Sequence, residues 1–264
     1  MRSQTIMKTI TTEYNFPVEL QPVMTLNPTK GSDIIGGRLA VVRQDNGATL
    51  GIVSDKYELL RHGQVIDAFR NALSNVNHEE KIQIANEGSS LFATYKLPGK
   101  TIEVRKGDLV SLQFVVKNSY NGTNALQIML GAFRLVCTNG MTIGRQFFSF
   151  SQKHIGSNGG VSIEIIKEKV EFLTDQFSKV LPYMQEMSRH ELSNSSEELF
   201  NLENEPLPKY LVNVARELYE KDKDYTRWGF YNGLTNAITH SMKHESPAAA
   251  LNYGKLAWEL AQRI

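Results

Sequence analysis

The fold of this chain is decided by the stretch Leu109-Val-Ser-Leu-Gln-Phe-Val-Val-Lys-Asn-Ser-Tyr-Asn-Gly-Thr-Asn-Ala-Leu-Gln-Ile-Met-Leu130. Two candidate strands, 109–118 and 124–130, flank the turn Ser119-Tyr-Asn-Gly-Thr123. Asn-Gly readily adopts the positive φ angles that a tight turn between strands needs. The stretch therefore predicts two neighbouring strands of an antiparallel sheet.

Four more strands are expected on its N-terminal side, in two pairs: 38–43 with 49–53, and 81–85 with 90–96. The first pair turns at Asp45-Asn-Gly47 and the second at Asn86-Glu-Gly88. Between the pairs, residues 61–73 carry apolar side chains at helical spacing, which predicts an amphipathic helix. The expected order is β-β-α-β-β-β-β.

The pattern becomes helical after the glycine-rich break at 156–160. Helices are expected at 162–187, where Pro182 kinks or ends the helix, and at 197–202, 208–221, 228–240 and 247–263. The fold class is therefore α+β: a curved antiparallel sheet with a helix between β-hairpins, followed by helices. We expect an irregular N-terminal arm at 1–36 that holds at most one edge strand, a core domain at 37–157 and a helical region at 158–264. The arm packs on its own domain or reaches a neighbouring subunit.

Composition narrows the location and the class of function. The chain has 264 residues, and 29 basic side chains nearly cancel 28 acidic ones, so net charge alone does not favour a nucleic acid or a membrane. A single cysteine excludes a disulfide within the chain and fits a reducing compartment. The first residues lack the apolar core of a signal peptide, and no apolar run is long enough to span a membrane. The expected location is the cytoplasm.

Four segments together resemble one known family. They are Gly51-Ile-Val-Ser-Asp-Lys-Tyr-Glu-Leu-Leu60, Phe114-Val-Val-Lys-Asn-Ser-Tyr-Asn-Gly-Thr123, Phe133-Arg-Leu-Val-Cys-Thr-Asn-Gly-Met141 and Thr226-Arg-Trp-Gly-Phe-Tyr-Asn-Gly-Leu-Thr-Asn-Ala-Ile-Thr-His240. Their order and spacing resemble the phage- and plasmid-borne family catalogued as a domain of unknown function, the 932 family. Many relatives have alanine where Gly233 stands, which makes the start of that helix less certain.

The resemblance implies a mobile-element context, with the cytoplasm of the host cell as the location for a phage-encoded protein. At the level of the fold alone, the expected sheet and helices also resemble phage single-strand annealing proteins. This second resemblance is an analogy, because one fold hosts many functions.

Cys137 lies in the segment Gly131-Ala-Phe-Arg-Leu-Val-Cys-Thr-Asn-Gly-Met-Thr-Ile-Gly144. Free cysteine is often a buried and inert side chain, and this interpretation is favoured here. The alternative is a thiol nucleophile with a histidine as its base. The candidate bases are His62, His78, His154, His190, His240 and His244.

Cofactor motifs are missing from the sequence. His240 and His244 lie on one helical face, but the glutamate of the zinc-protease motif is absent. Neither a phosphate-binding loop nor a dinucleotide-binding glycine motif occurs. We therefore expect no metal, no cofactor and no catalytic residues.

Basic residues close to aromatic ones suit single-stranded nucleic acid, because cations meet phosphates while rings stack on bases. Arg134 and Arg145 lie in and after the Cys137 segment, with Lys153 just beyond. A second group surrounds the expected hairpin loop, and the complete set of candidate binding residues is Arg134, Arg145, Lys153, Lys117, Lys96, Arg105, Lys106 and Tyr120. We expect Lys96 and Lys117 to share a face near this loop and Tyr120 to lie in an exposed turn; the alternative is a solvated loop with a packed tyrosine.

The leading hypothesis is a non-enzymatic protein of a phage or mobile element that binds single-stranded DNA, or RNA, and promotes annealing or recombination as a homo-oligomer. No membrane is involved. The alternatives are a protein-binding module that modulates a host system and an enzyme that depends on Cys137.

Overall fold

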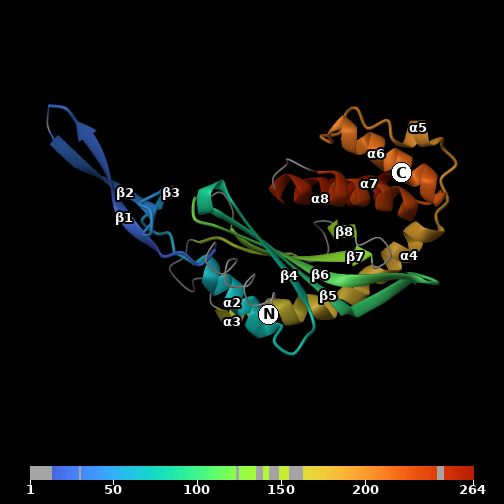
Figure 1. Ribbon diagram of the computed structural model, residues 1–264, viewed down its shortest axis with the longest axis horizontal. Helices are drawn as coiled ribbons and strands as arrows, with labels where there is room; N and C mark the ends of the chain where they lie inside the picture. Colours follow the sequence, from blue (N-terminus) through green and yellow to red (C-terminus); the bar gives the residue numbers. More distant parts are fainter. Residues whose placement is uncertain are drawn as a thin grey trace, which may run out of the picture.

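The computed structural model describes residues 14–29, 31–122, 125–134, 139–142, 149–154, 163–242 and 247–264. Within these residues the chain forms two antiparallel sheets and a helical C-terminal region, which confirms the α+β class (Figure 1). The expected order of strands and the first helix between residues 38 and 134 is also confirmed.

The main sheet consists of β4 (Glu79–Ala85), β5 (Ser90–Arg105), β6 (Asp108–Ser119), β7 (Leu126–Arg134), β8 (Asn139–Thr142) and β9 (Ser149–Gln152). The order is β4-β5-β6-β7-β8, and β9 pairs with the other half of the outer edge of β7. The central pair β6–β7 is the one predicted from the sequence, with Lys117 opposite Gln127. Gly131 of β7 pairs with Gln113 of β6, so the strand continues without a break through Gly131 to Arg134.

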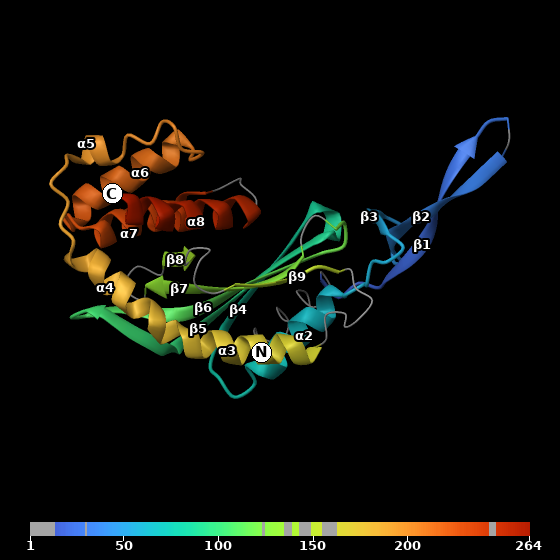
Figure 2. The same ribbon diagram turned by 180° about the vertical axis from the view of Figure 1, so that it is seen from behind.

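A second sheet contains β1 (Val18–Asn27), β2 (Gly31–Arg43) and β3 (Thr49–Ser54), in that order. The expectation of an irregular arm at 1–36 is wrong for its described part, because β1 and β2 form a long ribbon that projects from the body (Figures 1 and 2). Pro22 belongs to β1, which is an edge strand and does not need every backbone N–H. The expected boundary at residue 36 falls inside β2.

The base of this ribbon is tied to the main sheet. Phe16, Val41, Val53 and Tyr120 belong to one small buried cluster. Gly51 of β3 lies so close to Asn121 that a side chain would collide with the backbone there. The three-stranded sheet therefore rests on the turn that follows β6.

The helix α2 (His62–Ala72) covers one face of the main sheet, as its apolar spacing predicted. The Phe69 ring stacks on Tyr95 of β5 at 4.9 Å and meets Phe114 of β6 edge-on at 6.2 Å. Helix α3 (Ile163–Gln176) packs beside α2 (Figure 2).

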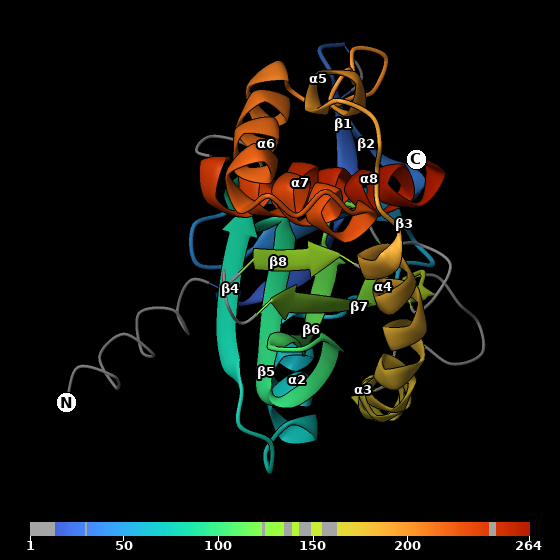
Figure 3. The ribbon, with the colours of Figure 1, turned by 90° about the vertical axis from the view of Figure 1, so that its right-hand side faces the viewer.

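The remaining helices are α4 (Leu181–Arg189), α5 (Ser196–Leu199), α6 (Lys209–Asp222), α7 (Arg227–Ser241) and α8 (Pro247–Arg263). The predicted helix at 162–187 is interrupted by a 3₁₀ turn, η2 (Phe177–Val180), after which Pro182 occupies the first turn of α4. Helices α7 and α8 lie against β8 (Figure 3). The aromatic side chains of Trp228, Tyr231 and Trp258 in these helices are buried.

Gly229 in the first turn of α7 has no room for a side chain, because a Cβ atom would overlap the carbonyl oxygen of Asp224. We expect Gly229→Ala to lower the free energy of unfolding by about 2 kcal/mol, since backbone must move. The matched control is Gly99→Ala, because Gly99 faces open space, and we expect it to stay within about 0.5 kcal/mol. Urea titration measures both. Equal stability of the two variants would contradict the described packing of residue 224 on α7.

Candidate functional site

The predicted binding residues are separated by the structure into buried, partly buried and exposed groups. Arg145 and Cys137 lie outside the described residues. Arg105, Arg134 and Tyr120 lie in packed contacts, and the lysines divide between a face of the main sheet and exposed loops.

Asp108, at the start of β6, is the centre of a network of charges. Its side chain is only 5% exposed. Arg134 at the end of β7 donates to it twice, from Nε to Oδ1 at 2.5 Å and from Nη2 to Oδ2 at 2.8 Å. The indole Nε1 of Trp228 in α7 donates to Oδ2 at 2.9 Å. A carboxylate out of water needs such donors, because burial otherwise favours its neutral form.

Arg105 extends this network to the start of α7. Its Nη1 and Nη2 atoms donate to the two carboxylate oxygens of Asp224 at 3.2 and 2.5 Å, and its Nε lies 3.5 Å from Asp108. Asp224 also accepts from the Thr226 hydroxyl at 2.7 Å, and that hydroxyl caps α7 by accepting from Gly229 N at 3.1 Å. We call Arg105, Asp108, Arg134, Asp224 and Trp228 the Asp108 cluster.

The Asp108 cluster changes the interpretation of two candidates. Arg134 is a predicted binding residue, but its side chain is only 13% exposed and is engaged by Asp108. Arg105 is more exposed, but both of its terminal nitrogens are used by Asp224. Arg105 therefore joins the sheet to the start of α7, and Arg134 holds the carboxylate of Asp108, which also accepts from Trp228 of α7.

Of the two expectations for Tyr120, an exposed ring and a packed one, the packed one is confirmed. Its side chain is fully buried, its ring stacks on His62 at 3.9 Å, and its hydroxyl accepts from His62 N at 2.7 Å. The sequence showed only the turn at Asn121-Gly122, and nothing in it revealed that the second sheet covers this turn. Tyr120 is therefore a packing residue between the two sheets.

His62 is held in its neutral form. Its Nε2 lies 3.1 Å from the Gly88 carbonyl oxygen and its Nδ1 lies 3.0 Å from the Asn118 amide nitrogen. Since an amide nitrogen only donates, Nδ1 accepts and Nε2 carries the proton. Burial lowers the pKa of His62 to about 3. With both nitrogens engaged, His62 is not available as a catalytic base.

His154 lies next to this group, and sequence reasoning gave it no role beyond that of a possible base. Its ring is buried 5.2 Å from the ring of Tyr57, and neither ring nitrogen has a hydrogen-bond partner. Burial lowers the pKa of His154. Its backbone carbonyl accepts from Glu58 N at 2.8 Å, which fixes the segment after β9.

The other face of the main sheet, opposite α2, carries the lysines. The strand register sets Lys96 opposite Gln113 and Phe92 opposite Lys117, so these four side chains share one face, which we call the lysine face. Lys96 and Lys117 therefore share a face as expected, although the turn at Lys106-Gly107 lies at the far end of β6 from Lys117.

Lys117 is the notable cation of the lysine face. It is buried, and its Nζ lies 5.6 Å from the centre of the Phe92 ring. Burial, and then the nearby charge of Lys255 in α8, lower the pKa of Lys117. It forms no ion pair with the residues that the structure describes. Gln113, four residues earlier on the same face of β6, has a buried Oε1 that meets no hydrogen-bond partner among the described residues.

Lys106 and Lys153 are exposed, in the β5–β6 turn and just after β9 respectively. In the described part of the chain, no three histidine, cysteine, aspartate or glutamate residues gather in a way that holds a metal ion. Among the same residues, no helix combines the length and the apolar character needed to cross a membrane.

The arrangement thus places Lys96 and Lys117 on one face of the main sheet. A family model described as Domain of unknown function (DUF932) matches residues 49–257. The chain belongs to the DUF932 family. No solved structure matches it. The DUF932 match begins at β3 and ends in α8, so it includes the Asp108 cluster and the lysine face but leaves out β1 and β2.

The Asp108 cluster is expected to contribute to the free energy of unfolding of this DUF932 protein. Asp108→Asn leaves Arg134 buried without its counter-charge, so we expect the free energy of unfolding to fall by about 3–5 kcal/mol. Asp33→Asn is the control, because Asp33 is exposed on β2 and forms no ion pair with the described residues. Urea titration of both variants is the measurement. A loss below about 1 kcal/mol for Asp108→Asn would mean that the cluster contributes little.

The lowered pKa of His62 makes the free energy of unfolding depend on pH. Its pKa is lowered from 6.5 to about 3. Between pH 6.5 and about pH 3, His62 is therefore protonated in the unfolded chain and neutral in the folded chain. Stability is therefore complete above pH 6.5 and declines toward pH 3, with a loss of about 2 kcal/mol at about pH 5. We expect His62→Asn to reduce the difference in unfolding free energy between about pH 7.5 and pH 5 by this amount. His190→Gln, at an exposed position, controls for removing a histidine, and an unchanged pH dependence in His62→Asn would refute the assignment.

Proposed function

We propose that this DUF932 protein binds single-stranded DNA, or RNA, along the lysine face and promotes strand annealing without catalysing a covalent step. The observation that carries the proposal is the approach of Lys117 and Lys255 to each other without an acidic partner for Lys117 among the described residues. Two ammonium groups in this position repel each other, and a phosphate beside them removes the repulsion.

Two residues on the same face as Lys117 support a nucleotide rather than a small inorganic anion. The Oε1 atom of Gln113 is buried and unpaired, so it can accept a hydrogen bond from an N–H group on a base edge. The Phe92 ring lies beside Lys117, and aromatic rings offer a surface on which bases stack. Phosphate, base edge and base face therefore each have a partner on one face of the sheet.

The burial of this face favours a single strand over a duplex. Lys117 and Gln113 are largely shielded from solvent, so a rigid double helix meets mainly the outer cations. A single strand is flexible enough to reach recessed groups while its remaining bases stay free to pair. Exposed Lys106 and Lys153 then contribute charge at the margins.

One copy of the chain has a net charge of only +1, so its overall attraction for a polyanion is weak. We therefore propose that several copies act together, because repeating a modest site along one strand raises the effective affinity. The single cysteine and the resemblance to phage-borne sequences favour action in the cytoplasm of a host cell.

A second candidate function is a protein-binding module that modulates a host system. The observation in its favour is the projecting ribbon of β1 and β2, which carries exposed apolar side chains. Such a module would bind a protein tightly and would show no salt-dependent affinity for oligonucleotides.

The lysine face is tested by replacing Lys117 with glutamine and measuring the fluorescence anisotropy of a labelled single-stranded oligonucleotide. We expect Lys117→Gln to weaken binding about five- to tenfold at about 50 mM salt and to reduce the salt slope by about one, because one phosphate contact is lost. The matched control is Lys221→Gln, at an exposed position on α6, which removes the same charge and should bind like the wild type. A wild-type protein that fails to bind at about 50 mM salt would overturn the proposal, and equal binding by both variants would exclude the lysine face.

A further inference from the structure

Lys117 is a buried lysine on a fixed strand. It lies on β6, which pairs with β5 on one side and with β7 on the other, so its backbone is held in place. The residue is 7% exposed, and its Nζ lies 5.6 Å from the centre of the Phe92 ring. A charged amine that is shielded from water is costly unless a carboxylate lies beside it. Lys117 forms no such ion pair within the part of the chain that the structure describes.

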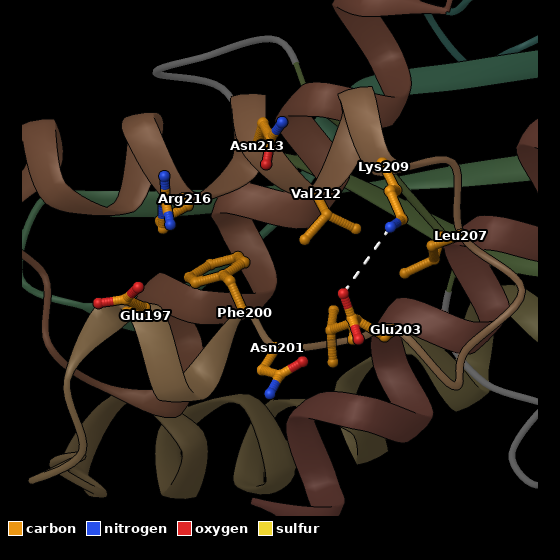
Figure 4. A pocket seen from close by; sticks show the side chains of 10 residues that line it. Glu197, Phe200, Asn201, Glu203, Leu207, Lys209, Val212, Asn213 and Arg216 are labelled. Carbon is orange, nitrogen blue, oxygen red and sulfur yellow. Dashed lines mark ion pairs between the residues drawn. The ribbon is translucent and has the colours of Figure 1, made fainter.

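A lysine in the cavity between α5 and α6 shows the contrast. This cavity of about 440 Å³ is lined by Lys209 and Arg216 and also by Glu197 and Glu203 (Figure 4). Lys209 is exposed and pairs with Glu203 at 3.7 Å. Water and a carboxylate therefore both stabilise its ammonium group, whereas Lys117 has no acidic partner of this kind among the described residues.

The amine of Lys117 is reachable from solvent although most of the side chain is buried. Some polar side-chain atoms of the described residues are fully buried and have no hydrogen-bond partner, and Oε1 of Gln113 is one of them. Nζ of Lys117 forms no hydrogen bond with the described residues either, yet it is not among these fully buried atoms. The buried area therefore belongs mainly to the hydrocarbon stem, and a ligand can approach the nitrogen.

Two features of this position favour the neutral amine. Burial, and then the charge of Lys255 in α8, lower the pKa of Lys117. A neutral amine has a free lone pair, which adds to the carbon atom of a carbonyl group. Proteins make lysine reactive in the same two ways, by removing water from the amine and by placing a second cation near it.

We propose that Lys117 forms an imine with an aldehyde that is carried beside a phosphate group. Lys255 supplies a positive charge near Lys117 that attracts the phosphate. The Phe92 ring beside Nζ offers a surface for a flat ring of the ligand. Amine, cation and aromatic ring thus each have a partner in one ligand.

The reaction balances without an oxidant, a reductant or a further reactant. The nitrogen lone pair of Lys117 forms a C–N bond to the aldehyde carbon, while the C=O double bond becomes a single bond and a proton moves from nitrogen to oxygen. The resulting carbinolamine loses its hydroxyl group and the remaining N–H proton as water, which leaves a C=N bond. Addition of water reverses both steps.

Two kinds of molecule carry an aldehyde beside a phosphate. One is a single-stranded DNA that has lost a base, because the open form of its deoxyribose is an aldehyde between two phosphates. The other is a small phosphorylated aldehyde. The first source rests on the proposed binding of single strands, whereas the imine itself requires only Lys117 and its neighbours. Strand annealing still needs no covalent step.

The first test treats the full-length protein with pyridoxal phosphate, a flat phosphorylated aldehyde, and then with borohydride, which converts the imine into a stable amine. Peptide mass spectrometry locates the label. We expect Lys117 to be labelled about tenfold faster than exposed Lys221 at about pH 7, because each unit by which a pKa falls gives about ten times more neutral amine. Added inorganic phosphate should slow the labelling of Lys117. Equal rates at the two lysines would contradict the proposal.

The second test offers the protein a single-stranded oligonucleotide with an abasic site, again followed by borohydride. Lys117→Arg keeps the positive charge but does not form an imine, so it should lose most of the trapped adduct. Lys221→Arg is the matched control and should give as much adduct as the wild type. Circular dichroism checks the fold of both variants, and the comparison of the two lysines in the wild type does not depend on either variant.

The two tests together identify the ligand. Capture of the abasic oligonucleotide at a lower concentration than pyridoxal phosphate indicates a damaged strand, and the reverse order indicates a small phosphorylated aldehyde. A wild-type protein that binds intact oligonucleotide but gives no adduct with either aldehyde would refute the imine and leave the proposed function standing. An adduct at Lys117 without oligonucleotide binding would refute the proposed function and support the imine.

Discussion

Asp108 is the constraint on which the arrangement of sheet and helices depends. Its buried carboxylate accepts from Arg134 of β7 and from Trp228 of α7, while Arg105 connects it to Asp224. Removing a carboxylate from water costs several kcal/mol, and this cost is offset only when all of these donors are in position. The cluster therefore couples the end of the β5–β6 hairpin to the start of α7, and α6 and α8 pack on α7.

The two uses of basic residues in this molecule are distinguished by their partners. Arg105 and Arg134 form ion pairs with Asp224 and Asp108, so their charges stabilise the fold. Lys117 faces Lys255, and burial together with this like charge lowers its pKa. A buried cation beside another cation gains the most from an added anion. This contrast directs the functional proposal to the lysine face and away from the arginines.

Sequence reasoning was most successful where neighbouring residues decide the structure. The helical spacing at 61–73 and the turn signals at 45–47 and 86–88 led to α2 and β3 close to their observed bounds and to the start of β5, which continues nine residues beyond its predicted end at residue 96. It left the packing of Tyr120 open and failed for the ribbon of β1 and β2. The burial of Tyr120 comes from His62 and from a second sheet, and the edge position that accommodates Pro22 depends on which strands pair.

Local patterns in the chain predict the order of elements and the α+β class, because turns, caps and periodicity act over a few residues. The same patterns place Lys96 and Lys117 on neighbouring strands. The role of each charged side chain cannot be read from these local patterns. Arg105 meets Asp224 across 119 positions of sequence, and Trp228 meets Asp108 across 120. Such contacts form only when the helices close over the end of the sheet. Because the helices close over the sheet in this way, Arg105 and Arg134 form ion pairs that stabilise the fold. Lys117 forms no ion pair with the described residues.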